Sequence, residues 1–404
     1  MIKINLLFSG LIPEERLEWT SELLKEFVKR TKSNNIIRKI NLFLSGDALF
    51  SLIDKRVRDY WLSILKSIKI QIVIDYSELN ILGHKIDMPN VRDSSKINVK
   101  DNTKIDKLDF WKRLIEESIV NKHDSKFGFL QLEGPYMHRT SVYALRVLRA
   151  ALKNNLKPEF YGYLDGVHMG HKGQQPSEFE NIAEELLTIK NLANKKGHDF
   201  LMLACSRCGT ARGYKKSQFK KDYINSDDVI SSYNFCNLNK IINQFENKHL
   251  IYSSNSASII NDELKNQEIS FNSEYYNAPP PIMILLTHSP YGLEWTFGGL
   301  SFAMACANHG IPTQIVFIED GSYSIVGNHN IKDAFKIFNV HDIIEATSDM
   351  DNLEYYAYSP SLKRRGLTIS RKLESVNLIN KNSLSDLFLH SNNRNFFHKR
   401  VIFF

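Results

Sequence analysis

The sequence predicts an α/β protein made of three similar units in a row, each a doubly wound parallel sheet. Three observations lead to this fold class. Short apolar runs bounded by turn residues recur along the chain, each run is followed by a helical pattern, and two units place Pro-Tyr and Asp-Gly at the same separation. Strands that alternate with helices in units of roughly 110–130 residues form parallel sheets with right-handed crossovers.

The first strand of each unit is an apolar run that ends in small or turn residues. The three runs are Ile2–Gly10, Phe127–Tyr136 and Ile282–Gly292. Continuous apolar runs of this kind are typical of strands buried on both faces of a sheet. In the last unit we expect the next helix to stop at Gly310, because glycine commonly ends a helix.

A second strand follows in each unit and ends in a Gly/Asp turn. These strands are predicted at residues 39–50, 159–170 and 313–324. From Pro135 to Asp165 is 30 residues, and from Pro290 to Asp320 is also 30. The equal spacing predicts that these loops occupy equivalent places in the middle and last units.

A third strand leads to a closing glycine, which is Gly83, Gly213 or Gly366. Eight residues before that glycine stands Asp75 in the first unit, Cys205 in the middle unit and Tyr358 in the last. Only the middle unit therefore carries a thiol at this position. Each unit then closes with a short strand and a helix, predicted at residues 97–115, 234–245 and 376–388.

Composition places the unit boundaries in two polar linkers. The first lies near residues 122–126, and the second, at 253–281, is rich in Ser and Asn and ends in three prolines. Such stretches are typical of linkers. We therefore predict domains at residues 1–122, 123–253 and 278–404.

The bulk composition excludes several protein classes. Hydrophobic residues make up 43% and charged residues 24% of the 404, as in a globular protein with a large core. The net charge of +7 is spread over the whole length, so we expect no direct nucleic-acid binding. Four cysteines make no disulfide framework, which favours a cytoplasmic protein. The apolar runs are too short for a signal peptide or a membrane span.

The cysteine pair Cys205 and Cys208 has the pattern of a reactive thiol site. Open α/β sheets bind ligands at the carboxyl ends of their strands, and Cys205 ends an apolar run. The next residues would enter a helix N-terminus, where free N–H groups favour an anion, and Arg207 and Arg212 add positive charge. Both effects lower the pKa of a thiol. Such a thiolate can attack a sulfur atom and hold it as a persulfide.

Two other interpretations of the pair stay open. Both cysteines can be small core residues, since free cysteine is often buried. A C-x-x-C pair after a strand is also the arrangement of a redox dithiol. A zinc site is not expected, because structural zinc needs four ligands, while Cys236 stands alone and His198 lies in the strand lead-in.

Two loops supply further candidates, and each can also be a plain surface turn. The polar loop after the second strand holds Asp165, Gly166, His168 and His171. It can cover Cys205 or steer a sulfur donor. The turn that ends at Tyr136 can bind an anion at a helix start. Cys236 and Cys306 lie on apolar faces, and we expect both in the core.

With these residues assembled, the chain resembles the DsrE/DsrF-like sulfur-relay family, which includes the TusBCD and DsrEFH complexes. The marks are the strand that ends in "GPY", the "DGV" turn, and "CSRCGTARG" in the middle unit with "SPSLKRRG" in the last. The resemblance covers most of the chain and implies three tandem flavodoxin-like domains. The first unit resembles the family only in the order of its elements.

The resemblance also implies roles for single residues. The middle unit is similar to the TusD or DsrE subunit, with Cys205 as the persulfide cysteine and Cys208 as a second cysteine that assists or resolves. Arg212 would stabilise the anion. The residues expected to bind substrate or partner are Tyr136, Asp165, Gly166, His168 and Gly213. The first unit, DsrE/DsrH-like, and the last, TusC/DsrF-like, would be catalytically silent, because Asp75 and Tyr358 cannot carry sulfane sulfur.

The partners implied are sulfur-carrier proteins, a TusA-like donor and a TusE- or DsrC-like acceptor. A homodimer would bring six domains together, and no small-molecule cofactor or metal is implied. The end use would be tRNA thiolation or dissimilatory sulfur oxidation. Three functions therefore stay open: a sulfurtransferase on Cys205, a thiol–disulfide oxidoreductase using Cys205 and Cys208, and a non-catalytic assembly module.

Overall fold

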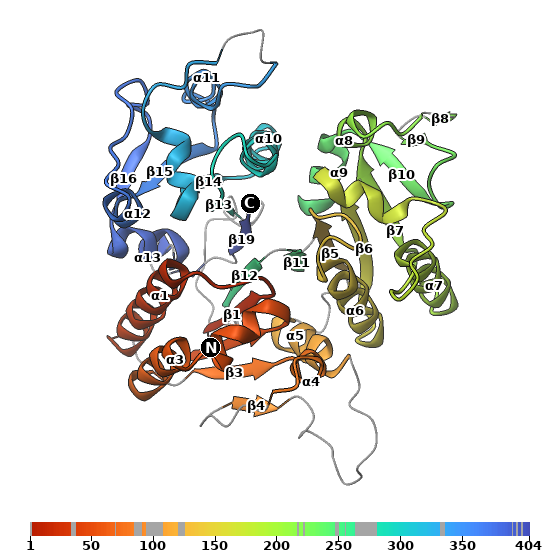
Figure 1. Cartoon of the computed structure of the whole chain (residues 1–404), viewed down its shortest axis with the longest axis horizontal. Coiled ribbons are helices and arrows are strands. Elements are labelled where there is room, and N and C mark those ends of the chain that lie inside the picture. The colour runs from red at the N-terminus through yellow and green to blue at the C-terminus, as the bar shows by residue number, and fades with distance from the viewer. Residues whose placement is uncertain are drawn as a thin grey trace, which may run out of the picture.

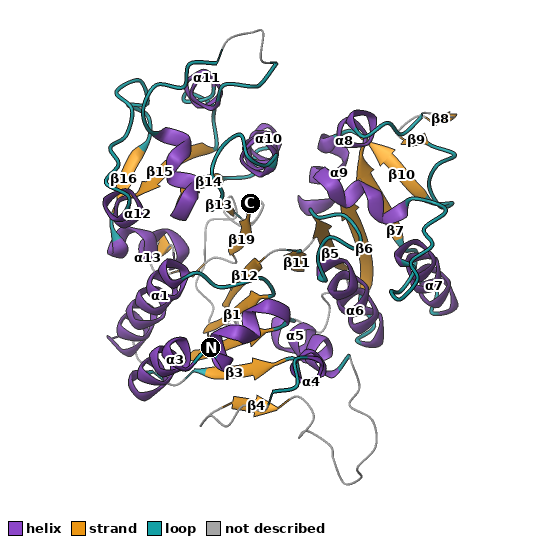
Figure 2. Ribbon diagram, viewed as in Figure 1, coloured by secondary structure: helices purple, strands orange, loops and turns teal. Residues whose placement is uncertain are grey.

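The chain folds into three α/β units that build two large sheets (Figures 1 and 2). The computed structural model describes residues 2–33, 38–68, 70–84, 91–93, 108–119, 126–215, 218–220, 223–246, 250–254, 256–262, 281–331, 336–389, 391–392, 395–396 and 399–404. Among these residues no helix is both long enough and apolar enough to span a membrane. Neighbouring strands within each unit are mostly parallel, which confirms the predicted fold class.

The middle unit forms a seven-stranded sheet in the order β11-β5-β6-β7-β10-β9-β8. Its elements are β5 Lys126–Gln131, α6 Thr140–Lys153, β6 Lys157–Gly162, the 3-10 helix η3 Leu164–Gly170, α7 Ile182–Lys195, β7 Leu201–Cys205, α8 Ser206–Ala211, β8 Gln218–Lys220, β9 Tyr223–Asn225, β10 Tyr233–Cys236, α9 Leu238–Glu246 and β11 Leu250–Ser253. The strands that the apolar runs predict are the parallel ones. β8 and β9 add an antiparallel edge.

The first and last units share a ten-stranded sheet in the order β16-β15-β14-β13-β19-β12-β1-β2-β3-β4. The first unit contains β1 Ile2–Phe8, α1 Glu14–Ser33, β2 Arg38–Leu44, η1 Gly46–Leu49, α2 Phe50–Ile53, α3 Lys55–Ser67, β3 Gln71–Ile74, α4 Tyr76–Ile81, β4 Val91–Asp93 and α5 Asp109–Ser118. The last unit contains β13 Ile282–Leu286, α10 Trp295–Asn308, β14 Thr313–Phe317, η5 Glu319–Ile325, α11 Val340–Ala346, β15 Leu353–Tyr358, α12 Ser359–Arg364, β16 Asn377–Ile379, α13 Lys381–Leu389, β17 Ser391–Asn392, β18 Asn395–Phe396 and β19 Lys399–Phe403.

Most predicted elements are present, with shifted ends. The second strands are shorter than expected, because the 3-10 helices η1, η3 and η5 take up their last residues. α10 ends at Asn308 and Gly310 follows with φ +74°, as predicted. The closing strand expected from residue 97 lies outside the described residues.

The strand β12 Ser256–Asp262 corrects the linker prediction. This segment was expected to be a linker, but it pairs antiparallel with β1 on one side and with β19 on the other. The pairing covers the edge of β1, whose N–H and C=O groups would otherwise be open to another strand. Residues 263–280 and 122–125 of the two predicted linkers lie outside the described residues, and the domain boundaries stay a prediction.

The three units close into a ring through three helix pairs. The first helix of each unit packs on the last helix of another: α1 on α13, α6 on α5, and α10 on α9 (Figure 1). The strands β11, β12 and β19 approach one another near the middle of this ring. Each unit is therefore held by both of the others.

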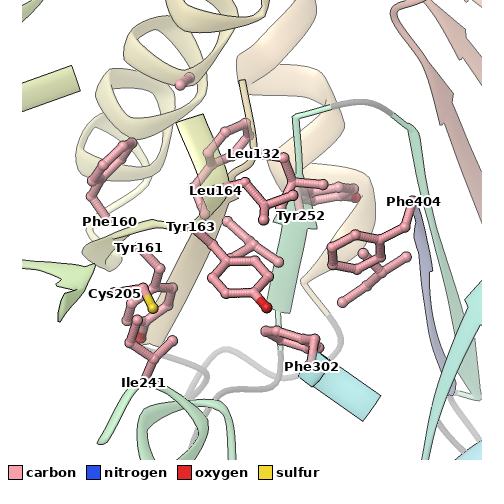
Figure 3. Close-up of a cluster of buried hydrophobic side chains, with 14 of the residues drawn as sticks. Leu132, Phe160, Tyr161, Tyr163, Leu164, Cys205, Ile241, Tyr252, Phe302 and Phe404 are labelled. Atoms are coloured by element: carbon pink, nitrogen blue, oxygen red, sulfur yellow. The ribbon is translucent and has the colours of Figure 1, made fainter. Parts of the chain in front are cut away.

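The hydrophobic core crosses the unit boundaries. Tyr163 of the middle unit points toward Phe302 and Phe404 of the last (Figure 3), with ring centroids 5.8 and 6.3 Å away. Its hydroxyl donates to the carbonyl of Gly298, at 3.0 Å. Buried aromatic rings supply much of the stability of such contacts. The contact fixes α10 of the last unit beside the end of β6, the second strand of the middle unit.

Candidate functional site

Cys205 lies where the sequence places it, at the end of a buried strand and the start of a helix. It is the last residue of β7, and α8 begins at Ser206. Gly213 closes the helix with φ +84°, a left-handed conformation that favours glycine. The predicted site residue Gly213 therefore shapes the turn through its backbone.

The same strand–cap–helix frame occurs in all three units. Asp75 caps α4 after β3, and Tyr358 caps α12 after β15. The closing glycines of these two frames, Gly83 and Gly366, have φ +68° and +64°. The structure thus confirms the internal alignment, which sets Asp75, Cys205 and Tyr358 in equivalent places.

The Cys205 thiol ionises near neutral pH. Its pKa falls to about 7, first because the Cys208 thiol donates to its sulfur, then because of the N–H groups of Cys208 and Arg207 and the charge of Arg207; burial acts against this. The same contact with Cys205, together with burial, raises the pKa of Cys208 far above its usual range. The pair therefore holds one thiolate at Cys205 and one proton at Cys208. Both residues are buried, with Cys205 only 3% exposed.

The first unit shows how this frame directs N–H groups at the cap side chain. There the carboxylate of Asp75 accepts hydrogen bonds from the N–H groups of Ser77 and Glu78, at 3.2 and 3.4 Å. The matching N–H groups at Cys205 are those of Arg207 and Cys208, and they stabilise its anion although the thiol makes no capping hydrogen bond of that kind. These N–H groups favour an anion at the cap position, although at Asp75 burial outweighs them and raises the pKa of the carboxyl.

The two arginines of the motif have different surroundings. The Arg207 guanidinium lies over the Phe297 ring of the last unit, 5.3 Å from its centroid. Arg212 donates to Asp165 at 2.6 Å and to Glu294 of the last unit at 2.7 Å. Arg207, rather than Arg212, is the cation that lowers the pKa of Cys205. The predicted role of Arg212 as anion stabiliser stays a proposal, and its contacts show a bridge between two units.

The last unit repeats the Arg212 bridge without a thiol. Arg365, seven residues after Tyr358, donates to Asp320 at 2.8 Å and to Glu15 of the first unit at 2.7 Å. This matches the contacts of Arg212 with Asp165 and Glu294. The bridge therefore belongs to the docking of units, whatever stands at the cap position.

The predicted loop around Asp165 lies against the cysteine pair. The preceding Leu164 has a positive φ of 50°, as has Glu319 at the equivalent place. The N–H of Leu164 acts on the Cys208 sulfur. Gly166 packs against the Gln131 carbonyl so closely that a Cβ atom would lie 2.0 Å from it. Gly166 is therefore needed for the path of this loop.

The predicted His168 and Tyr136 lie beside other groups. His168 Nδ1 is 2.8 Å from the Tyr214 hydroxyl, and burial lowers the pKa of His168. The ring of His171 also lies against Tyr214. Tyr136 donates to Gln174 at 2.8 Å, ahead of α7. The structure thus brings Asp165 and Arg212 together with the cysteines, and Tyr136 packs with a different loop.

The structure adds Tyr163 to the surroundings of the cysteine pair and shows where Cys236 lies. Tyr163 is buried beside Cys205 and Cys208, and burial raises its pKa well above the usual value, so it stays neutral. Cys236 pairs in register with Cys205 across β7 and β10. Cys236 and Cys306 are buried, as expected, and all four cysteines are free thiols.

The described residues contain no group of three or more His, Cys, Asp or Glu side chains that could hold a metal ion. The chemistry that the site offers is that of a thiolate beside a protonated thiol.

One family of known proteins matches two parts of the chain. The model of the DsrE/DsrF-like family matches residues 125–243 and 281–394, together more than half of the chain. No curated protein matches. Among solved structures, the crystal structure of the ychN protein from E. coli is similar, with 17% identity, a TM-score of 0.26, and coverage of 31% of this chain and 99% of that one. Because the family model covers more than half of the chain, the chain belongs to the DsrE/DsrF-like family.

Proposed function

We propose that the protein is a sulfur-relay protein that accepts sulfane sulfur as a persulfide on Cys205 and passes it to a carrier protein. The single observation that carries this proposal is the Cys205 thiol, with a pKa of about 7, at the end of β7, where the N–H groups of Cys208 and Arg207 act on its sulfur. Family membership supports it, because DsrE-like proteins work in sulfur relay with partner proteins.

The proposed step is a transfer without net oxidation. The Cys205 thiolate attacks the outer sulfur of a donor persulfide, R–S–SH, and a new S–S bond forms on Cys205. The donor S–S bond breaks, and the donor leaves as the thiolate R–S⁻. Cys208 keeps its proton at neutral pH, so it donates to the reacting sulfur instead of competing as a nucleophile.

The proposed partners follow from the burial of the pair. Because Cys205 is almost fully covered, a partner must place its own cysteine against the loop at Leu164 and the start of α8. A TusA-like donor and a TusE- or DsrC-like acceptor fit this requirement. A cytoplasmic homodimer, with transfer toward tRNA thiolation or dissimilatory sulfur oxidation, completes the proposal.

The test is to load the full chain with a persulfide donor and digest it with trypsin. Cleavage after Lys196, Arg207 and Arg212 puts Cys205 and Cys208 on different peptides. We expect a gain of about 32 Da, reversible by thiol, on the peptide that ends at Arg207. Cys205→Ser should abolish the gain and Cys208→Ser should retain it. An unmodified Cys205 peptide, under conditions that load a relative of the family, would refute the proposal.

A second function, thiol–disulfide exchange, is favoured by the contact between the two thiols. In that case Cys205 and Cys208 form a redox couple, and Cys208→Ser abolishes activity as fully as Cys205→Ser. Oxidised protein would then carry a disulfide between the two residues. The loading experiment separates the two functions, because only the relay tolerates serine at position 208.

A further inference from the structure

We infer that Phe297, in the first turn of α10 of the last unit, is a positioning residue for Arg207 at the cysteine site of the middle unit. The inference rests on the proposed function of Cys205. It gives the last unit, which has no cysteine at its own cap position, a part in the chemistry of its neighbour.

The geometry of α10 carries the inference. The Phe297 ring contacts the Arg207 guanidinium, 5.3 Å from its centroid, and also the ring of Phe338, whose centroid is 4.4 Å away. α10 itself is fixed to the middle unit by the bond from Tyr163 to Gly298. A Cβ atom on Gly298 would lie 2.8 Å from Leu164, so this glycine lets the helix approach. The aromatic ring is therefore held in place before Arg207 meets it.

Arg207 needs such a partner because its side chain is exposed. A free arginine side chain samples many rotamers, and ordering it costs entropy. The face of an aromatic ring attracts the guanidinium and restricts it. Held there, the charge stays near the start of α8, where it stabilises the Cys205 anion. Without the ring the charge would spend more time away from the sulfur.

The other two sites have no such pair. At the place of Arg207, two residues after the cap, the first unit has Ser77 and the last has Pro360. Phe297 stands seven residues after Pro290. The residue seven positions after the equivalent Pro135 is Val142, in α6, the helix that approaches the site of the first unit. The arginine and its aromatic partner therefore occur together where the cap residue is a thiol.

Several other charged and titratable groups lie around Cys205, and a test of Phe297 must leave them unchanged. Cys208 and Arg207 lie on α8, Cys236 on β10, and neutral Tyr163 ahead of η3. Asp165 and Glu294 neutralise Arg212. None of these groups is altered by a substitution at Phe297.

The experiment measures how the alkylation rate of Cys205 depends on pH, by mass spectrometry of its tryptic peptide. This readout needs no sulfur transfer, so its failure is distinct from failure of the proposed function. The variants are Phe297→Leu, which keeps apolar bulk, Phe297→Tyr, which keeps the aromatic face, Arg207→Gln, and the double variant. For Arg207→Gln the two cysteines share a peptide and are separated by fragment ions. Thermal unfolding checks that each variant folds.

We expect Phe297→Leu to raise the apparent pKa of Cys205 by about half a unit, close to the effect of Arg207→Gln. Phe297→Tyr should restore the parent value. In the Arg207→Gln background, Phe297→Leu should have no further effect, because it acts through Arg207. A Phe297→Leu profile equal to the parent, or an equal shift with and without Arg207, would overturn the inference.

Discussion

The cysteine site and its two counterparts share the strand–cap–helix frame but differ in the contacts that a neighbouring unit makes with each of them. In all three, a helix from a neighbouring unit contacts the frame or the loop beside it. At the first site Arg139, which precedes α6, and Arg146 of α6 both bind Glu78, and at the last site Arg16 of α1 binds Glu319. At the cysteine site the contacts are Phe297 over Arg207 and Glu294 with Arg212. The frame therefore joins the units, and one copy adds a thiol to it.

The sites also differ in the exposed fractions of the side chains that form these ion pairs. The side chains of Arg16 and Glu319 are each 6% exposed. The carboxylates that hold Arg212 are 60% exposed at Asp165 and 59% at Glu294. A buried charge left without its partner is costly, whereas an exposed pair contributes little. The buried pair of Arg16 and Glu319 should therefore contribute more to the docking of units than the exposed bridge at Arg212 does.

The largest expected effect comes from breaking the buried pair. Arg16→Met should lower the free energy of unfolding by about 3–5 kcal/mol, because Glu319 would be left buried without its cation. Chemical denaturation of the full chain measures this. Cys205 should keep its alkylation profile in the folded variant. A loss below about 1 kcal/mol would show that the pair is not what holds the first and last units together.

Removal of the second thiol tests the chemistry of the middle copy. Cys208→Ala removes the strongest influence that lowers the pKa of Cys205. We expect the apparent pKa to rise by about one unit or more, which slows alkylation at pH 7 roughly fivefold or more. Cys208→Ser is the matched control, since its hydroxyl still donates. Equal rates for the alanine variant and the parent protein would show that Cys208 does not set the ionisation of Cys205.

The smallest effect is expected at the exposed bridge. Arg212→Met should change the free energy of unfolding by about 1 kcal/mol or less, because its partners are solvent-exposed. The same denaturation experiment measures it beside Arg16→Met. If Arg212→Met lowered the free energy of unfolding as much as Arg16→Met does, the exposed bridge and the buried pair would stabilise their interfaces equally, which contradicts the prediction.

The local frame could be predicted from the sequence, and the contacts between units could not. The strand that ends at Cys205, the glycine turn at Gly213 and the equivalence with Asp75 and Tyr358 follow from residue patterns within one unit. Phe297 and Glu294 reach the site from a helix more than eighty residues away in the sequence, and no local pattern marks that approach. The sequence favoured Arg212 as an anion stabiliser because it does not reveal that Asp165 and Glu294 bind this side chain.

The central claim is that Cys205 is a sulfur acceptor poised near neutral pH. The most direct test is the pH dependence of sulfur loading on each of the four cysteines, read from one tryptic digest. Only the thiolate reacts, so loading of Cys205 should rise with pH, with about one tenth of the thiol ionised at pH 6 and about nine tenths at pH 8. Cys236, whose pKa burial raises to about 12, should stay unmodified throughout, and so should Cys306 inside α10. Loading with a midpoint near the ordinary thiol pKa, or equal loading of all four cysteines, would contradict the account.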